Sequence, residues 1–256
     1  LFTRLLGFSE QEMLGKTPRM FKSGRHDKAF YDAMWANMRA TGHWQGEIWN
    51  RRKNGEIFPE RMSLSAVKDA NDKVTHYVCM FTDISAEKAR EQQLEFLAHR
   101  DTLTGLPNRS QFTRMLGEAV ELSQSTNRRM AVLLFNIDRF KDVNDSYGHS
   151  IGDEVLRHVA VQMQGALRHG DIIGRLAGDE ICVVAQSICG HNSAVEVAER
   201  LMAAAGQPWT TPDGLSVVVS VSAGICMFPE HADTTASLLQ GAHAAVYGAK
   251  ERSEEH

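Results

Sequence analysis

The first third of the chain changes from a helical to an alternating hydrophobic pattern. Apolar residues recur at helical spacing over residues 26–39, which predicts an amphipathic helix that ends at Gly42. From Trp44 onward apolar and polar positions alternate, and the Asn-Gly pair at 54–55 predicts a hairpin turn. A further strand is expected over residues 76–81. The pattern predicts a small antiparallel sheet preceded by helices.

A charged helix is expected to follow the sheet, over residues 85–99. Ile84, Leu94 and Leu97 stand near heptad spacing, and charged residues fill the other faces. A solvated linker helix and a short dimeric coiled coil both fit this pattern, because about two heptads are too few to choose between them.

Helices and strands alternate over the rest of the chain, beyond a turn-rich joint at 101–109. A continuous apolar run at 130–137 predicts a buried strand, and two short strands flank a tight polar turn at 177–180. Further helices and strands are expected at 111–123, 152–167, 172–173, 181–185, 194–205, 215–227 and 236–250. Strands that alternate with helices around a central hairpin predict an α/β sandwich.

Length and composition fit an ordinary two-domain protein. The 256 residues are 43% hydrophobic and 23% charged, which allows two domains with real cores. A net charge of -4 gives no reason to expect nucleic acid as a partner. The four cysteines show no CxxC spacing, so reduced thiols are expected.

The chain carries no recognisable targeting segment. No run reaches the about 20 apolar residues of a membrane span, and no signal peptide is recognisable. The chain begins at Leu1 rather than Met. We therefore expect a fragment that is cytoplasmic, either as such or as the cytoplasmic part of a larger, membrane-anchored protein.

Three carboxylates are expected at one edge of the second sheet. Asp138 follows the buried strand, and Asp179 and Glu180 lie in the polar turn. If the two strands are neighbours, these side chains meet, and clustered carboxylates suit Mg²⁺, which shares its ligands with phosphates. Gly178 would let the backbone approach a nucleotide closely. On spacing alone, a solvated turn is the commoner alternative.

Five motifs in the second part of the chain stand in a recognisable order. They are DTLTGLPNR at 101–109, NIDRFKDVNDSYGHSIGD at 136–153, RLAGDEI at 175–181, SAG at 222–224 and YGAK at 247–250. In this combination the chain resembles the GGDEF domain of diguanylate cyclases, from about residue 98 to 251. The resemblance implies an α/β sandwich over residues 100–256, similar to nucleotidyl cyclase catalytic domains, that condenses two GTP molecules into cyclic di-GMP.

The resemblance also implies roles for the turn. Asp179 and Glu180 resemble the catalytic residues, and both resemble ligands of a bound Mg²⁺ or Mn²⁺ ion. The backbone carbonyl of Ile137 and the side chain of Asn136 would complete the metal site. Such an ion neutralises the charge that develops when the 3′-hydroxyl of one GTP attacks the α-phosphate of another.

A set of substrate-binding positions is implied in the same way. Asn144 and Asp153 match the pair that hydrogen-bonds guanine, since an amide and a carboxylate together can read its edge. The remaining positions are Leu156 beside the base, Phe140, Lys141 and Gly178 near the phosphates, and Lys250 at the γ-phosphate. Because each domain would hold one GTP, the active form would be an antiparallel homodimer.

Arg168 and Asp171 match the family's RxxD product-inhibition motif at its usual spacing. An arginine and a carboxylate can hold a guanine and a phosphate of cyclic di-GMP. The alternative is a surface ion pair between residues three apart.

The chain also departs from the family pattern. Asn136 stands where the family carries a metal-binding aspartate, so a negative charge is lost. Ala177 replaces a signature glycine, and its methyl would crowd the nucleotide or require an unfavourable φ. Ile181 replaces a phenylalanine, and Glu254 stands where the family has an arginine that contacts the triphosphate.

These departures leave two functions open for the second domain. The first is an active diguanylate cyclase under sensory control with product inhibition. The second is a degenerate GGDEF domain that binds GTP or cyclic di-GMP and regulates a partner or an EAL-type phosphodiesterase domain beyond residue 256.

Residues 1–84 resemble a PAS sensor domain that lacks its first strands. The motifs are GFSEQEMLG at 7–15, SGRHD at 23–27, GHWQGEIWNRRKNGE at 42–56 and FTDI at 81–84. The ligand of this domain stays unknown. No flavin-adduct cysteine motif is present, and His26 and His43 are expected to be surface or turn residues rather than haem ligands.

The two resemblances together imply a signalling homodimer that forms through the PAS domain, the linker helix at 85–99 and the GGDEF domain. A PAS signal would change the packing of the linker helices and so decide whether two GTP sites face each other. An interpretation of a different class is a pure dimerisation and interaction protein that binds no nucleotide.

Overall fold

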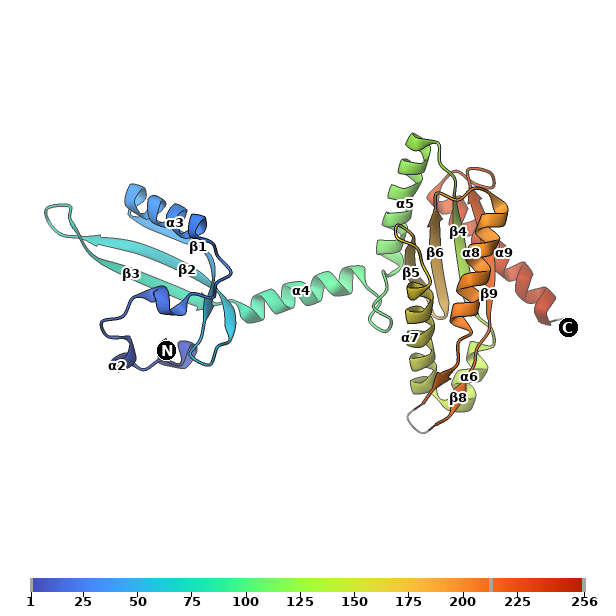
Figure 1. Cartoon of the computed structure of the whole chain (residues 1–256), viewed down its shortest axis with the longest axis horizontal. Helices are drawn as coiled ribbons and strands as arrows, with labels where there is room; N and C mark the ends of the chain where they lie inside the picture. Colours follow the sequence, from blue (N-terminus) through green and yellow to red (C-terminus); the bar gives the residue numbers. More distant parts are fainter. Residues whose placement is uncertain (1, 212–213, 255–256) are drawn as a thin grey trace. The chain divides into compact units, whose positions relative to one another are not determined.

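The computed structural model describes residues 2–211 and 214–254, and the chain divides into two compact units, Leu1–Leu94 and Glu95–His256 (Figure 1). The boundary lies inside one helix, α4 (Ser85–His99). Each unit combines helices with antiparallel strands, an α+β architecture, which confirms the expected antiparallel sheet with helices followed by an α/β sandwich. Among the described residues, no helix is both long and apolar enough to cross a membrane.

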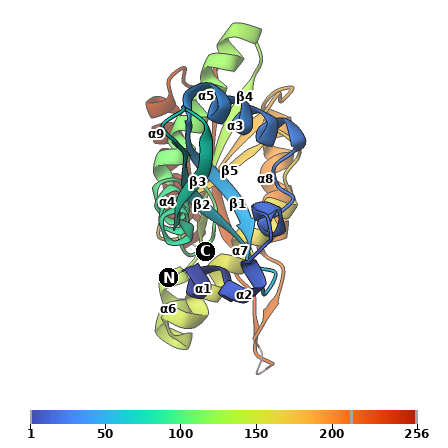
Figure 2. The ribbon, with the colours of Figure 1, turned by 90° about the vertical axis from the view of Figure 1, so that its left-hand side faces the viewer.

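The N-terminal unit is an antiparallel sheet preceded by short helices. In chain order its elements are α1 (Phe2–Leu6), α2 (Glu10–Met13), the 3-10 helix η1 (Pro18–Phe21), α3 (Lys28–Thr41), β1 (His43–Arg51), β2 (Ile57–Lys68) and β3 (Val74–Asp83). The strands pair in the order β1-β2-β3. Figure 2 shows α3 at one end of this sheet and α1 and α2 at the other.

Local sequence explains where α3 and the first hairpin begin and end. The Asp27 side chain caps α3 by accepting a hydrogen bond from the Phe30 amide at 2.9 Å. Gly42 ends the helix in the left-handed conformation, with φ of 72°. Gly55 has φ of 92° in the turn between β1 and β2. The predicted helix and hairpin are therefore confirmed.

The core of this unit is small. Leu6, Phe21 and Phe58 form its buried cluster. By contrast, β3 is exposed along most of its length, with Tyr77 and Met80 open to solvent. The unit therefore has a sheet with little apolar cover along β3.

The C-terminal unit is a sheet with helices on both faces. Its elements are α5 (Arg109–Thr126), β4 (Met130–Ile137), α6 (Phe140–Tyr147), α7 (His149–Gly165), β5 (Ile172–Ala177), β6 (Glu180–Gln186), α8 (His191–Ala205), β7 (Trp209–Thr210), β8 (Ser216–Val217), β9 (Val221–Phe228) and α9 (Thr235–Glu254). The sheet order is β5-β6-β4-β9, with every neighbouring pair antiparallel. The hairpin β5-β6 thus lies beside the buried strand β4, which meets the condition on which the expected carboxylate cluster depended.

Alternation along β4 divides the core into two layers. Met130, Val132 and Leu134 pack with residues of α5 and α9, whereas Leu133 and Phe135 pack with residues of α7 and α8. Helices α5 and α9 therefore cover one face of the sheet, and α7 and α8 cover the other. The end of this strand therefore lies between two helical layers.

The structure differs from the expectations after β4 and in the segment before β9, where the short strand β7 was also not predicted. Residues 140–147 form a separate helix, α6, where no helix was predicted. The single strand expected over 215–227 is divided into β8 and β9. Short, polar α6 has too few apolar positions for a clear periodicity, which explains why the sequence did not reveal it.

Glycine at position 224 determines how closely α9 approaches the sheet. A Cβ there would lie 2.4 Å from the backbone nitrogen of Val246 and 2.4 Å from the carbonyl oxygen of Ala242. No side chain fits in this space, so α9 lies directly on β9. This close packing brings His243 and Lys250 of α9 to the ends of β4 and β6.

Candidate functional site

The hairpin turn between β5 and β6 is held in place by one arginine. Ala177 pairs with Glu180 across the turn, and Gly178 takes a positive φ of 48°. The Arg175 guanidinium donates two hydrogen bonds to the Gly178 carbonyl, from Nε at 2.8 Å and from Nη2 at 2.6 Å. Its Nη1 lies 2.9 Å from Oδ1 of Asp101. The turn is therefore anchored to the joint that precedes α5.

Asp101 is a charged anchor for that arginine. Burial alone would raise the pKa of Asp101, but hydrogen bonds from Thr104 and the contact with Arg175 outweigh it, so the pKa lies below its usual range. The carboxylate stays ionised at neutral pH and completes the ion pair with Arg175.

Ala177 does not strain the turn. It is exposed, and its φ is not among the positive values found in the described residues. The expected conflict between its methyl group and the backbone is therefore absent at this position. Its methyl group reaches solvent at the surface of the turn.

The carboxylate of Glu180 lies beside an amide at the edge of the sheet. Glu180 and Asn136 are direct partners in the β4-β6 pairing, so both side chains lie on the face that α9 covers. Lys250 on α9 donates a hydrogen bond from Nζ to Oδ1 of Asn136. His243, also on α9, has its Nε2 3.5 Å from Oε2 of Glu180.

The expected cluster of three carboxylates does not form. Asp138 accepts hydrogen bonds from the hydroxyls of Ser220 at 2.6 Å and Ser222 at 2.7 Å, on the β9 side of β4. Among the described residues, no three His, Cys, Asp or Glu side chains are grouped to hold a metal ion. The two serines engage the carboxylate that the sequence assigned to the cluster.

The donor atoms at this edge still fit a divalent ion. Glu180 offers a carboxylate, Asn136 an amide oxygen and Ile137, at the end of β4, a backbone carbonyl. Asp179 lies half-buried in the adjoining turn. Oxygen donors few in number suit Mg²⁺, which usually keeps several waters and shares its site with substrate phosphates. The Lys250 ammonium competes for the oxygen of Asn136.

Asn144, one of the two residues predicted to read guanine, lies against the start of α7, beside the position that precedes Asp153. A Cβ at Gly152 would lie 2.0 Å from Oδ1 of Asn144, so the Asn144 amide extends across the first turn of α7, next to Asp153. Gly148 joins the two helices with φ of 83°. The pair shares one corner of the unit, beyond the end of β4.

The other residues predicted to contact the nucleotide differ in their exposure to solvent. Phe140 and Lys141 occupy the first turn of α6, whose N-cap residue makes no side-chain capping bond, so that their backbone amides have no partner within the helix. Leu156 is only 2% exposed and packs in the core under α7. It has little surface to offer a base, whereas the first turn of α6 is accessible.

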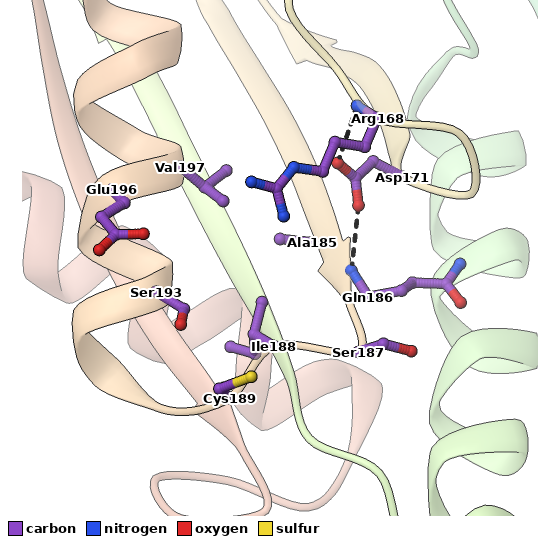
Figure 3. Close-up of a pocket in the computed structure, with 10 residues that line it drawn as sticks. All are labelled: Arg168, Asp171, Ala185, Gln186, Ser187, Ile188, Cys189, Ser193, Glu196 and Val197. Carbon is purple, nitrogen blue, oxygen red and sulfur yellow. Dashed lines mark hydrogen bonds between the residues drawn. The ribbon is translucent and has the colours of Figure 1, made fainter.

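Arg168 and Asp171 line one small hollow beside α8 (Figure 3). Asp171 is held by two backbone amides, those of Arg168 and Gln186, each at 3.2 Å. The side chain of Arg168 extends toward Val197 on α8 instead. The hollow has a volume of about 80 Å³, and its carboxylate and guanidinium point in different directions.

The histidines of the N-terminal unit make local contacts. His26 accepts a hydrogen bond from the Trp49 amide at 2.9 Å and stacks on Phe30 with ring centroids 4.0 Å apart. Burial lowers the pKa of His26. His43 lies 3.1 Å from the Ser65 hydroxyl.

Sequence reasoning missed His243 and Arg175 as contributors to the site. His243 precedes Lys250 by seven residues, two turns of one helix, so helical spacing could have placed both on the same face. Arg175 was part of a quoted motif, but its contact with Asp101 joins segments far apart in the chain.

Comparison with known proteins agrees with this architecture. A family profile described as "Diguanylate cyclase, GGDEF domain" matches residues 98–256, and a PAS domain profile matches residues 2–86. The diguanylate cyclase TpbB of Pseudomonas aeruginosa is 34% identical over 200 residues, which cover 77% of this chain and 46% of that protein. The cyclic di-GMP phosphodiesterase PdeR of Escherichia coli is 30% identical over 249 residues, covering 96% of this chain and 37% of that protein.

A solved structure of the GGDEF domain of PA1120 (TpbB or YfiN) from Pseudomonas aeruginosa matches with a TM-score of 0.58 and 40% identity. It covers 60% of this chain and 90% of that chain. The chain spans less than half of the length of these two curated relatives. The profile match over residues 98–256 shows that the chain belongs to the GGDEF family of diguanylate cyclase domains, and a PAS domain precedes the GGDEF domain.

Proposed function

We propose that the C-terminal unit is a diguanylate cyclase domain that condenses two GTP molecules into cyclic di-GMP. The observation that carries the proposal is the meeting of Glu180, Asn136 and Lys250 at one edge of the sheet. This edge adjoins the first turn of α6, where the phosphates of a nucleotide would be held. With GTP as the substrate, we also propose a cytoplasmic location for the domain.

Each step of the reaction has a group in the chain to support it. The 3′-oxygen of each GTP bonds to the α-phosphorus of the other, both bonds to pyrophosphate break, and the two hydroxyl protons pass to solvent water. Amides of the first turn of α6 would bind the phosphates, and the Lys250 ammonium would neutralise the leaving pyrophosphate. Asn144 and Asp153 would orient the guanine.

Glu180, Asp179, Asn136 and the Ile137 carbonyl would hold a Mg²⁺ or Mn²⁺ ion. When bound, such an ion supplies positive charge against the triphosphate. Glu180 is the direct strand partner of Asn136, so we expect its carboxylate to contribute most to this site.

The direct test is to incubate the whole chain with GTP and Mg²⁺, and then with Mn²⁺, and to separate the nucleotides by chromatography. Cyclic di-GMP that is lost in Glu180→Gln is the expected result. Absence of the product with both ions would overturn the proposal.

A second function is favoured by the contact between Lys250 and Asn136. A neutral amide binds a cation less strongly than a carboxylate, and here its oxygen is already engaged by an ammonium group. The domain would then bind GTP or cyclic di-GMP and regulate a partner or an EAL-type phosphodiesterase domain. PdeR, named a cyclic di-GMP phosphodiesterase, is a relative compatible with that arrangement.

The substitution Asn136→Asp separates the two functions. If the wild-type domain is a regulatory binder, the variant will gain turnover by at least an order of magnitude while its GTP affinity changes little. If the wild type is already an efficient cyclase, the variant will leave the rate within a few-fold. Both quantities can be measured on the same samples, by product formation and by calorimetry.

We further propose that the PAS domain controls the cyclase through α4 in a homodimer. Within the N-terminal unit, the start of α4 is tied to the sheet by ion pairs of Arg61 with Glu87 at 2.9 Å and of Lys88 with Glu47 at 3.0 Å. Leu94 and Leu97 are exposed on the helix. Burial of these leucines between two copies would couple the units, and Leu94→Glu with Leu97→Glu should weaken dimerisation in ultracentrifugation.

Arg168 and Asp171 are proposed to bind cyclic di-GMP as an inhibitor. The guanidinium that extends into the hollow beside α8 supports this role. Arg168→Ala should raise the product concentration that half-inhibits the enzyme, without lowering the initial rate. An unchanged inhibition curve would contradict the assignment.

A further inference from the structure

Glu60 is a buried carboxyl group on β2, the central strand of the N-terminal sheet. It is only 3% exposed, and its Oε1 accepts a hydrogen bond from the Asn50 side chain of β1 at 2.8 Å. Its direct partner in the β2-β3 pairing is Asp83, so two carboxyl groups lie side by side on one face of the sheet. Like charges directly opposite each other are destabilising, and the pair is therefore most stable while one member is neutral.

Asp83 holds the start of α4. Its Oδ1 accepts a hydrogen bond at 2.8 Å from the backbone amide of Ser85, the first residue of that helix. Its Oδ2 is paired with the guanidinium of Arg52, which follows β1. Burial alone would raise the pKa of Asp83, but the hydrogen bonds from Ser85 and Arg52 outweigh it, so the pKa lies below its usual range. Asp83 therefore stays charged near neutral pH.

Arg52 is the counter-ion that a charged Glu60 would require. Within the described residues, the charges that act on Glu60 are those of Asp83 and Arg52. Beside it on β3 lies the Cys79 thiol, which stays neutral because burial raises its pKa to about 11. The helices that pack on this part of the sheet, α1 and η1, contribute apolar side chains, those of Leu6 and Phe21.

The same arginine is already engaged. Besides Asp83, it pairs with the exposed carboxylate of Glu56 at 3.1 Å. Its guanidinium lies over the ring of Phe58, 3.8 Å from the centroid. Phe58 precedes Glu60 by two residues and so lies on the same face of β2. A movement along this face would therefore transfer the guanidinium from Asp83 to Glu60.

We propose that Glu60 makes the attachment of α4 to the N-terminal sheet depend on pH. While Glu60 is protonated, Arg52 stays with Asp83, and Asp83 holds the amide of Ser85. Loss of the proton to water leaves a buried negative charge opposite Asp83, which is costly without a cation. This charge draws Arg52 away and weakens the hold of Asp83 on α4. Exposed ion pairs between α4 and the sheet remain, but such pairs contribute little to stability.

The surroundings of Glu60 set the pH range of this change. Burial raises its pKa from 4.5 to about 7, and the charge of Asp83 adds to this, whereas the Asn50 hydrogen bond and the charge of Arg52 act in the opposite direction. A state in which the carboxylate gains Arg52 or water has a lower pKa, so each pH unit between about 4.5 and about 7 favours that state by up to about tenfold. The attachment is tightest in acid and loosens as pH rises. If α4 carries the signal of this unit, as proposed above, pH is one of its inputs.

The backbone amide of Ser85 is a local probe of the attachment, because its hydrogen bond to Asp83 influences its proton chemical shift. The whole chain, isotope-labelled, would be titrated from about pH 5 to about pH 8 at constant ionic strength while this resonance is followed by NMR. In the wild type we expect the resonance to move toward higher field, with a midpoint at about pH 7, as the hydrogen bond weakens.

The decisive variant is Glu60→Gln, which keeps an oxygen for the Asn50 side chain but cannot ionise. Its Ser85 resonance should stay at the low-pH position throughout the titration. The matched control is Glu87→Gln, which removes an exposed carboxylate from the first turn of α4 itself and should titrate like the wild type. Circular dichroism would confirm that each variant is folded.

A Ser85 resonance that does not move in the wild type would overturn the proposal. Equal titration in the wild type and Glu60→Gln would overturn it as well, because another group would then be responsible. The measurement uses neither nucleotide nor turnover, so its outcome is independent of whether the C-terminal unit makes cyclic di-GMP.

Discussion

The two sheets of this chain are covered to very different extents. In the C-terminal unit, residues Met130 to Phe135 of β4 are all buried between helical layers. In the N-terminal unit, β3 is exposed along most of its length, including Tyr77 and Met80. The C-terminal sheet can therefore hold groups in fixed positions, whereas the N-terminal sheet offers surface for interaction. This division is compatible with the proposed roles, a cyclase in the covered unit and a sensor in the exposed one.

The largest expected effect is a loss of stability on truncating a buried strand residue of the C-terminal unit, compared with an exposed strand residue of the N-terminal unit. Leu133→Ala should lower the free energy of unfolding of the C-terminal unit by about 2–5 kcal/mol, because the side chain is fully buried. Met80→Ala, at a position 67% exposed, should change the stability of its unit by less than about 0.5 kcal/mol. Hydrogen exchange followed by mass spectrometry reports each unit separately, and similar losses in both would contradict the comparison.

The second prediction concerns a buried carboxyl group in the less covered unit. Burial raises the pKa of Glu60 from its ordinary value of 4.5 to about 7, although a hydrogen bond from Asn50 acts in the opposite direction. The unfolded chain therefore releases this proton at lower pH than the folded one. The stability of the N-terminal unit should fall as pH rises from about 4.5 to about 7, by about 3 kcal/mol, and then level off.

Urea unfolding at several pH values, followed by tryptophan fluorescence, would measure this slope. Glu60→Gln keeps the hydrogen bond with Asn50 but cannot ionise, so its stability should be flatter over the same range. An identical slope in both proteins would show that Glu60 is not the group responsible.

A smaller loss of stability is expected when the close packing of α9 on β9 is disturbed. Gly224→Ala places a methyl group against backbone atoms of Ala242 and Val246, which cannot yield. We expect a loss of about 1–3 kcal/mol and a displacement of His243 and Lys250 that lowers turnover. Gly248→Ala, a substitution on α9 itself, is the control, since a Cβ at position 248 would meet nothing within 4 Å. Equal turnover in the two variants would argue against a role for the position of α9.

The sequence predicted much of the fold because its strongest signals are local. The capped helix that ends at Gly42, the Asn-Gly hairpin and the apolar strand at 130–137 are all found in the structure. The family and the fold class are confirmed. The helix at 140–147 was missed, since eight mostly polar residues give no clear period.

The details of the site depend on contacts between distant segments, which a single sequence does not reveal. The serines that engage Asp138 lie more than eighty residues away. His243 reaches Glu180 only because Gly224 lets α9 lie close to the sheet. The catalytic, nucleotide-binding and inhibitory roles assigned from the sequence stay predictions.

The central claim, that the C-terminal unit joins two GTP molecules, is tested most directly by measuring pyrophosphate release together with cyclic di-GMP. The whole chain and its Glu180→Gln variant would be compared at saturating GTP and Mg²⁺, with GTP affinity measured in parallel. The account predicts two pyrophosphates for each cyclic di-GMP in the wild type, and a rate lower by at least about 100-fold in the variant, with GTP affinity retained. GTP binding without pyrophosphate release in the wild type would contradict it and would favour a regulatory nucleotide-binding domain.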